Sequence, residues 1–347
     1  MIVPFVDLAR QNVAMKGAIL SAVTRVVDSG RYLMGPEVAR FEKALAEWHG
    51  LFSAVAVASG TAACEIAIRA CGWHQVGTPA FGAVPTINAI EAAGAWPVLV
   101  DVDPRTRGVG VTNMVGVDVD GWIVVHMFGH PCAVPAGAIE DCAHAQGARY
   151  GGALVGTFGR AAALSMFPTK CLGNLGDAGA VVTNDTALAD KAREIRHYGG
   201  LLTGDVTMRG LNSRTSELSA AVLVEKLPLL HWWNGRRREI AARYRAELVD
   251  NVTVPYEAPG CEPSYHVFVI EHHERDRLAE ALKARGVGCM VHYPKALHEY
   301  TRWRHLGEPG QFPVAERLAR TVLSLPMFPE LTDQEVDHVI ASVKAET

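Results

Sequence analysis

The sequence has no long uncharged apolar run and almost no excess of charge of either sign. Its 347 residues include 33 Lys and Arg against 37 Asp and Glu, for a formal net charge of -4. With the two signs interspersed, the chain lacks the basic face that nucleic acid favours and the polybasic segment that anionic membranes favour. No window reaches the length of a membrane-spanning helix, and the first residues do not resemble a signal peptide. We therefore expect neither a nucleic acid partner nor a membrane partner.

The chain is also poor in cysteine. Its seven cysteines are scattered and show no CxxC spacing. Such a pattern indicates reduced, buried thiols rather than a disulfide framework or a zinc site, so we expect a cytoplasmic protein without a metal. Hydrophobic residues make up 49% of the chain, which is ordinary for a globular protein of this length.

What is present is an alternation of strand and helix patterns. Helical spacing of apolar residues covers 14–28 and 37–48, and short apolar strands are predicted at 54–58, 97–101 and 122–126. This alternation is typical of an α/β fold with a mostly parallel sheet covered on both faces. Ligands of such sheets bind outside the carboxyl ends of the strands.

The second half of the chain predicts a different arrangement. A long helix over 233–248 follows two shorter ones and leads to a mixed region. The further predicted elements are helices at 185–197, 214–227 and 275–285, strands at 265–271 and 287–291, and two closing helices. We therefore divide the chain into a large α/β domain, residues 1–230, and a small C-terminal α+β domain, residues 231–347.

A single lysine follows an apolar strand and precedes a glycine-containing loop. Lys170 lies between Ser165 and a second β-branched strand that ends near Asn184. An amine among apolar neighbours loses the solvation of its charged form and becomes a better nucleophile at neutral pH, as a carbonyl-binding lysine requires. Taken alone, however, a single lysine is usually a solvated surface residue.

Two other strand ends carry polar residues. Ser59-Gly60-Thr61 lies between a strand and a helix, where free N–H groups and the helix dipole attract an anion. Taken alone, however, such a turn is more often a plain helix cap. Asp141 ends a short apolar strand and is followed by His144. A carboxylate there is more often a cap or part of an ion pair.

Together these motifs resemble the DegT/DnrJ/EryC1/StrS family of sugar aminotransferases, which depend on pyridoxal 5'-phosphate (PLP). The lysine loop with its Leu175-Gly176-Asp177 ending and the stretch Gly210 to Leu218 are similar to family signatures, and the resemblance covers nearly the whole chain. It implies the PLP-dependent transferase fold type I, which is similar to aspartate aminotransferase. It also implies a homodimer with shared active sites, in which Asn212 reaches the cofactor phosphate of the neighbouring subunit.

The resemblance further implies a role for each motif residue. Lys170 would carry PLP, and Asp141 would pair with the pyridine nitrogen and keep the ring an electron sink. His144 would lie near the phenolic oxygen of the cofactor, where the family more often has glutamine. The other implied contacts are Ser59, Gly60, Thr61 and Ser165 for the phosphate, and Tyr32, His292, Tyr293 and His298 for the substrate.

The implied reaction moves an amino group from L-glutamate to a keto sugar, with pyridoxamine phosphate as the intermediate form of the cofactor. The lysine loop is most similar to that of enzymes acting on nucleotide-linked 3-keto-6-deoxyhexoses in amino-sugar biosynthesis. The same chemistry on a cyclitol or another small ketone is an alternative, as is a degenerate paralogue that binds a ligand or regulates without turnover. Two departures from the family pattern leave these alternatives open, since Ala83 replaces a ring-stacking aromatic and residues 126–139 lack a helix.

Overall fold

The computed structural model describes residues 1–201 and 204–347, and its centre is a seven-stranded sheet with the order β1-β9-β8-β5-β4-β2-β3. These strands are β1 (Ser53–Val57), β2 (Gln75–Pro79), β3 (Trp96–Val100), β4 (Gly121–Val125), β5 (Ile139–Asp141), β8 (Ala161–Ser165) and β9 (Gly179–Thr183). Only β9 runs antiparallel to its neighbours in this sheet. The predicted α/β fold with a mostly parallel sheet is confirmed.

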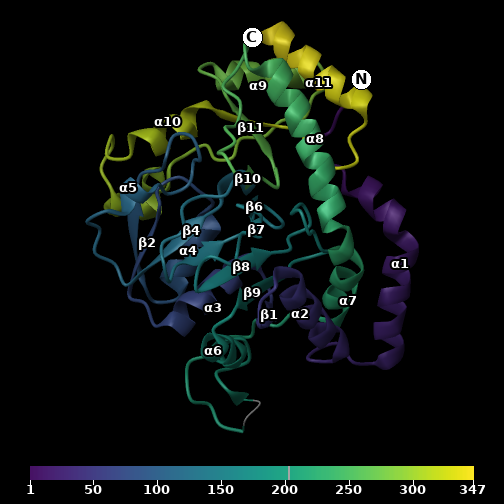
Figure 1. Ribbon diagram of the computed structural model, residues 1–347, viewed down its shortest axis with the longest axis vertical. Helices are drawn as coiled ribbons and strands as arrows, with labels where there is room; N and C mark the ends of the chain where they lie inside the picture. The colour runs from purple at the N-terminus through teal and green to yellow at the C-terminus, as the bar shows by residue number, and fades with distance from the viewer. Residues whose placement is uncertain (202–203) are drawn as a thin grey trace.

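Helices cover both faces of the sheet (Figure 1). Side chains alternate along a strand, so Ala54 and Ala56 of β1 pack in one core with α2 and α7, whereas Val55 and Val57 pack in another core with α3 and α6. The helices of this part are α1 (Leu8–Ser29), α2 (Pro36–His49), α3 (Gly60–Cys71), α4 (Val84–Ala92), α5 (Val111–Met114), α6 (Thr186–Arg196) and α7 (Glu217–Lys226).

The long helix α8 (Leu230–Leu248) runs from the sheet to the C-terminal elements (Figure 1). Those elements are β10 (Cys261–Glu262), β11 (Phe268–Glu271), α9 (Arg275–Ala284), α10 (Pro313–Thr321), β12 (Val322–Leu325) and α11 (Asp333–Glu346). The remaining short ones are β6 (Arg149–Tyr150), β7 (Ala153–Leu154) and the 3-10 turns η1 (Met127–Gly129), η3 (Leu227–Leu229), η4 (Leu297–Glu299) and η5 (Thr301–Leu306). Our proposed division assigns the first residues to the large domain, 1–230, but Val3 pairs with Val287 and packs in the C-terminal core.

Most predicted elements are present, and the differences have local causes. Helix α1 begins early, at Leu8, because the side chain of Asp7 accepts hydrogen bonds from two N–H groups of the first turn. The strand predicted at 287–291 is wrong, since that stretch holds only isolated bridges. Strand β2 was not predicted, because it contains Gly77 and Pro79, which are residue types typical of turns.

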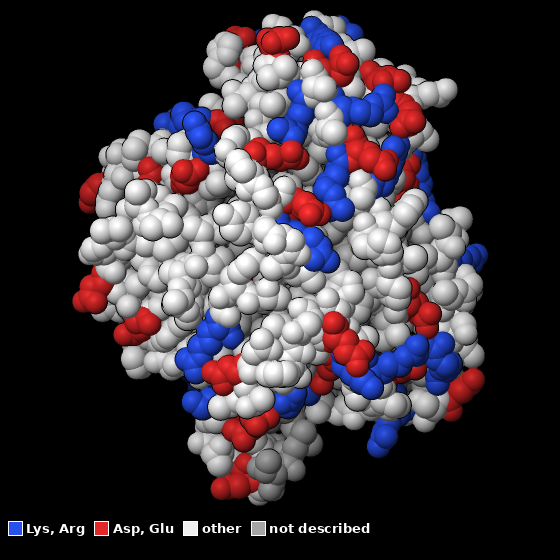
Figure 2. Space-filling model, in the orientation of Figure 1, with Lys and Arg blue, Asp and Glu red and all other residues white. Residues whose placement is uncertain are grey.

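The distribution of surface charge and the modest hydrophobicity of the helices agree with the composition. On the face in Figure 2, Lys and Arg are interspersed with Asp and Glu. Among the described residues, no helix is both long and apolar enough to cross a membrane.

Candidate active site

A cavity of about 300 Å³ opens where the loops after β1, β5 and β8 meet the start of α4. We call it the lysine cavity. It gathers eight of the residues singled out from the sequence, namely Ser59, Gly60, Thr61, Asp141, His144, Ser165, Lys170 and Tyr293. The position is that expected for a ligand of an α/β sheet.

One wall of the lysine cavity is the first turn of α3. Ser59 caps this helix by accepting a hydrogen bond from the N–H of Ala62 at 3.1 Å, so the capping interpretation is confirmed. Gly60 and Thr61 follow it and line the cavity. A Cβ at Gly60 would lie 2.5 Å from the Cβ of Ser165, so only glycine lets the helix start this close to the end of β8. A helix N-terminus beside a serine hydroxyl fits a phosphate group.

The carboxylate of Asp141 is fixed at the end of β5. Its Oδ2 accepts a hydrogen bond from the hydroxyl of Thr86 at 2.8 Å, and its Oδ1 accepts one from the N–H of Ala143 at 3.0 Å. Only 5% of the residue is exposed. A buried carboxylate held in this way suits a protonated ring nitrogen as partner. Thr86 was not predicted, because it stands on α4, a helix that the sequence analysis missed.

Lys170 lies in a turn that is held in place by two hydrogen bonds of the Gln146 side chain. The side chain of Gln146 donates to the carbonyl of Ser165 at 2.9 Å and accepts from the N–H of Leu172 at 3.0 Å, so it ties the lysine loop to the loop after β5. Burial lowers the pKa of Lys170 to about 8, although the charge of Asp141 acts in the opposite direction. A larger neutral fraction at neutral pH is what a carbonyl-binding amine requires.

Three imidazoles surround this lysine. The Nε2 of His266 is 3.5 Å from Lys170 Nζ, and the rings of His266 and His144 are 4.8 Å apart. Burial and the charge of Lys170 lower the pKa values of both histidines well below their usual range, and they lower that of His292 to about 4. All three rings are therefore neutral at neutral pH. His266 was missed, because it stands at the start of a predicted strand with no motif around it.

The tautomer of His144 follows from its neighbours. The N–H of Phe128 points to Nδ1 at 3.4 Å, so Nδ1 accepts and the hydrogen is on Nε2, which lies 3.4 Å from the hydroxyl of Tyr293. Ala83 also lines the cavity, and its small side chain places no aromatic ring at that position. Phe81 does not replace the missing aromatic, because it is fully buried and its ring packs edge-on to Phe128 and Tyr293.

Four predicted residues do not line the lysine cavity within one chain. His298 is buried against Glu316, with its Nε2 3.2 Å from the carboxylate, and His292 bonds to the hydroxyl of Ser324 at 2.8 Å. Tyr32 is half exposed, and Asn212 is exposed. Their roles toward substrate and partner subunit stay predictions.

Comparison with known proteins gives consistent matches over the whole chain. Residues 13–344 match the DegT/DnrJ/EryC1/StrS aminotransferase family. The chain is 39% identical to the erythromycin biosynthesis sensory transduction protein EryC1 of Saccharopolyspora erythraea (99% of each chain covered). It is 36% identical to the dTDP-3-amino-3,4,6-trideoxy-alpha-D-glucose transaminase of Streptomyces venezuelae (99% of this chain and 95% of that one). The solved structure of S. venezuelae DesV in complex with ketimine intermediate superposes with a TM-score of 0.94 at 35% identity, covering 99% and 98% of the two chains.

The family match and the geometry of the lysine cavity lead to the same assignment. The cavity supplies a helix N-terminus and Ser165 for a phosphate, Asp141 for a ring nitrogen and Lys170 for a carbonyl group, which is the donor set that PLP needs. The chain belongs to the DegT/DnrJ/EryC1/StrS aminotransferase family and is a PLP-dependent aminotransferase of fold type I.

Proposed function

We propose that this enzyme transfers an amino group from L-glutamate to a nucleotide-linked keto sugar, as a step of amino-sugar biosynthesis in the cytoplasm. The observation that carries the proposal is the pairing of Lys170, with its lowered pKa, and the fixed carboxylate of Asp141 in one cavity. The transaminase named above for a dTDP-linked amino sugar supports the substrate class. A nucleotide-linked 3-keto-6-deoxyhexose remains our specific expectation.

Each residue of the lysine cavity has a proposed task. PLP, when bound, supplies an electron sink for the carbanion at the substrate α-carbon. Lys170 would hold the cofactor through Nζ and afterwards accept and return a proton at that atom. Asp141, held by Thr86, would keep the ring nitrogen protonated. Gly60, Thr61 and Ser165 would hold the phosphate and so fix the position of the ring.

The neutral imidazoles bear on this proton transfer. Because His144 and His266 are uncharged, they do not lower the pKa of Lys170 further, and its amine can still hold the proton that it accepts. His144 carries hydrogen on Nε2 and can therefore donate to an oxygen in the cavity, as the family glutamine would.

We propose that the enzyme is a homodimer with shared active sites and that Asn212 completes the phosphate site of the partner subunit. Asn212 is exposed, and its Oδ1 accepts from the Nε of Arg214 at 3.0 Å. This contact leaves the amide NH₂ as a donor in a fixed orientation. A donor that is held ready and lies outside its own chain's cavity suits a contact across an interface.

A complementation experiment tests the shared site. Lys170→Ala and Asn212→Ala should each be impaired, the second because it loses a charge-assisted hydrogen bond of about 1.5–3 kcal/mol. A mixed dimer contains one site with both changes and one with neither, so activity should return in part when subunits exchange. No recovery after confirmed exchange would show that Asn212 acts only within its own chain.

A substrate panel tests the reaction itself. The purified enzyme is given L-glutamate with dTDP-linked and UDP-linked 3-keto sugars and with a keto cyclitol, and 2-oxoglutarate is measured. We expect turnover with a nucleotide-linked sugar. Turnover with the cyclitol alone would replace the proposed substrate class. Absence of turnover with every acceptor of the panel would favour the non-catalytic paralogue.

A further inference from the structure

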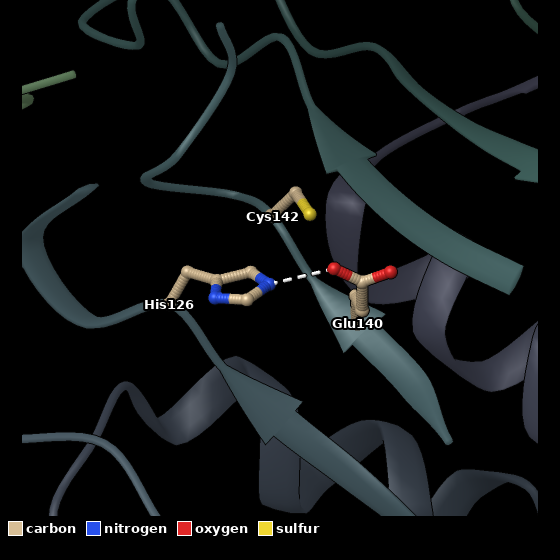
Figure 3. A group of neighbouring side chains, drawn as sticks. All are labelled: His126, Glu140 and Cys142. Carbon is tan, nitrogen blue, oxygen red and sulfur yellow. Dashed lines mark hydrogen bonds and ion pairs between the residues drawn. The ribbon is translucent and has the colours of Figure 1, made fainter. Parts of the chain in front are cut away.

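Buried titratable side chains outside the lysine cavity differ in whether they have a titratable partner. In the cluster of Figure 3, the ring of His126 points at the carboxylate of Glu140, with its Nε2 2.9 Å from Oε2, and Cys142 lies beside them. Lys226, the last residue of α7, is only 2% exposed, and neither of its hydrogen-bond partners in the described part of the chain is a carboxylate. A buried cation without a carboxylate partner costs free energy, so the place of Lys226 calls for a reason.

The ammonium group of Lys226 is directed at the lysine loop. Its Nζ donates to the carbonyl oxygen of Gly173 at 2.6 Å and to Oδ1 of Asn12, on α1, at 3.5 Å. Burial lowers the pKa of Lys226 to about 8, although the charge of Glu330 acts in the opposite direction. The amine is therefore still mostly charged at neutral pH, and its short contact with Gly173 is a charge-assisted hydrogen bond.

Gly173 packs directly against the main chain of Lys170. A Cβ on Gly173 would lie 2.1 Å from the carbonyl oxygen of Pro168 and 3.1 Å from that of Lys170, so the loop folds back closely on itself. The two ends of this turn are also joined, because the N–H of Asn174 donates to the carbonyl of Met166 at 2.9 Å. In so closely packed a turn, a shift at Gly173 is passed on to Lys170.

The other side of the lysine loop is held from α8. The side chain of Gln146 bonds to Ser165 and Leu172, and its main-chain carbonyl accepts from Nδ2 of Asn234 at 2.8 Å. Asn234 lies on α8 and is 1% exposed. The loop is thus supported from α7 and from α8, and the support from α7 comes from a charged group.

We propose that Lys226 is a positioning residue for Lys170: by holding the carbonyl of Gly173, it keeps the amine of Lys170 where the proposed proton transfer takes place. This inference rests on the proposed role of Lys170. Misplacing a reacting group by about 1 Å can cost about a hundredfold in rate. A support of this kind therefore bears on turnover, although Lys226 does not line the lysine cavity.

Stabilisation of the fold alone is the competing explanation. A cation in the last turn of a helix interacts favourably with the helix dipole, and Lys226 also reaches α1 through Asn12. Under that explanation, loss of Lys226 lowers the melting temperature but leaves Lys170 in its place. The two explanations therefore differ in how Lys170 behaves in the folded enzyme.

The first measurement is the pH dependence of PLP capture by the apoenzyme, in which only the neutral amine of Lys170 reacts. Lys226→Met removes the donor and keeps most of the apolar stem. If Gly173 is released, Lys170 becomes less buried and its pKa rises, so the midpoint should move up from about 8 by about half a pH unit or more. Burial, Asp141 and Cys171 set the pKa of Lys170, and the charge of Lys226 does not contribute, so the shift reports position rather than a lost charge.

The second measurement is the half-reaction of the PLP-loaded enzyme with L-glutamate. Lys226→Met should slow α-proton removal at least about tenfold and leave the glutamate concentration for half-maximal rate nearly unchanged, because the contact supports proton transfer rather than binding. Failure of the unmodified enzyme to react with glutamate, or PLP capture that survives Lys170→Ala, would count against the proposed function. The capture midpoint tests Lys226 without any amino donor.

Asn12→Leu is the matched control, because it removes the other partner of Lys226 and leaves the contact with Gly173 in place. It should keep the midpoint and the rate of the unmodified enzyme, and a shift equal to that of Lys226→Met would overturn the inference. So would an unshifted midpoint with an unchanged rate in folded Lys226→Met, whatever its melting temperature. If Lys226→Met does not fold, Lys226→Gln decides in the same way, because its donor is one atom closer to the main chain and must release or displace Gly173.

Discussion

Substitution of Gly60 by alanine should weaken PLP binding through one steric contact. The added Cβ would lie 2.5 Å from the Cβ of Ser165 and 3.1 Å from its Cα, closer than real Cβ contacts allow. The first turn of α3 must then move away from the end of β8, which separates the helix N–H groups from the Ser165 hydroxyl. Overpacking of this kind typically costs about 1–3 kcal/mol. If at least half of this free-energy cost applies to the PLP-bound enzyme and not to the apoenzyme, PLP affinity drops by roughly threefold to a hundredfold.

The assay is titration of the apoenzyme with PLP, with the melting temperature of the apoenzyme recorded in parallel. Gly17→Ala is the matched control, because Gly17 is also helical and a Cβ there meets nothing within 4 Å. That control should leave PLP affinity unchanged and stabilise the chain by about 0.5–1 kcal/mol. In a Ser165→Gly background, most of the additional loss from Gly60→Ala should disappear. Full PLP affinity in Gly60→Ala would refute the reasoning.

Three further predictions concern the charges of the lysine cavity. Lys170→Ala should abolish the borohydride-reducible attachment of PLP and all transamination, and residual turnover would exclude Lys170 as the anchor. Asp141→Asn should still bind PLP but slow α-proton removal from glutamate about a hundredfold or more, measured in the single half-reaction; a near-normal rate would contradict the role of Asp141. Capture of PLP by the apoenzyme should accelerate as pH rises through about 8, the pKa of Lys170, because only the neutral amine attacks a carbonyl. His266→Leu removes an acceptor of the ammonium and should move that midpoint down by about half a pH unit, whereas His266→Asn should not.

The parts of the site that could be predicted lie at strand ends with a local signature. Ser59, Asp141 and Lys170 each follow a short apolar strand, and parallel strands bring such ends together at one edge of the sheet. Thr86 could not be found in this way, because the preceding strand, β2, contains Gly77 and Pro79 and so does not match a strand pattern. His266 could not be found either, since its contact with Lys170 joins residues that lie far apart in the sequence.

The electrostatic state of the lysine cavity arises from packing that no single segment specifies. His144 follows β5, His266 precedes β11 and His292 precedes a short coil, yet all three meet near one amine. Burial disfavours every additional positive charge there, and each imidazole therefore stays neutral while Lys170 keeps a pKa of about 8. A positively charged group at any of these positions would lower the pKa of Lys170 further and compete with it for the carboxylate of Asp141. With neutral rings around it, Lys170 keeps a pKa from which it can both release and accept a proton near neutral pH.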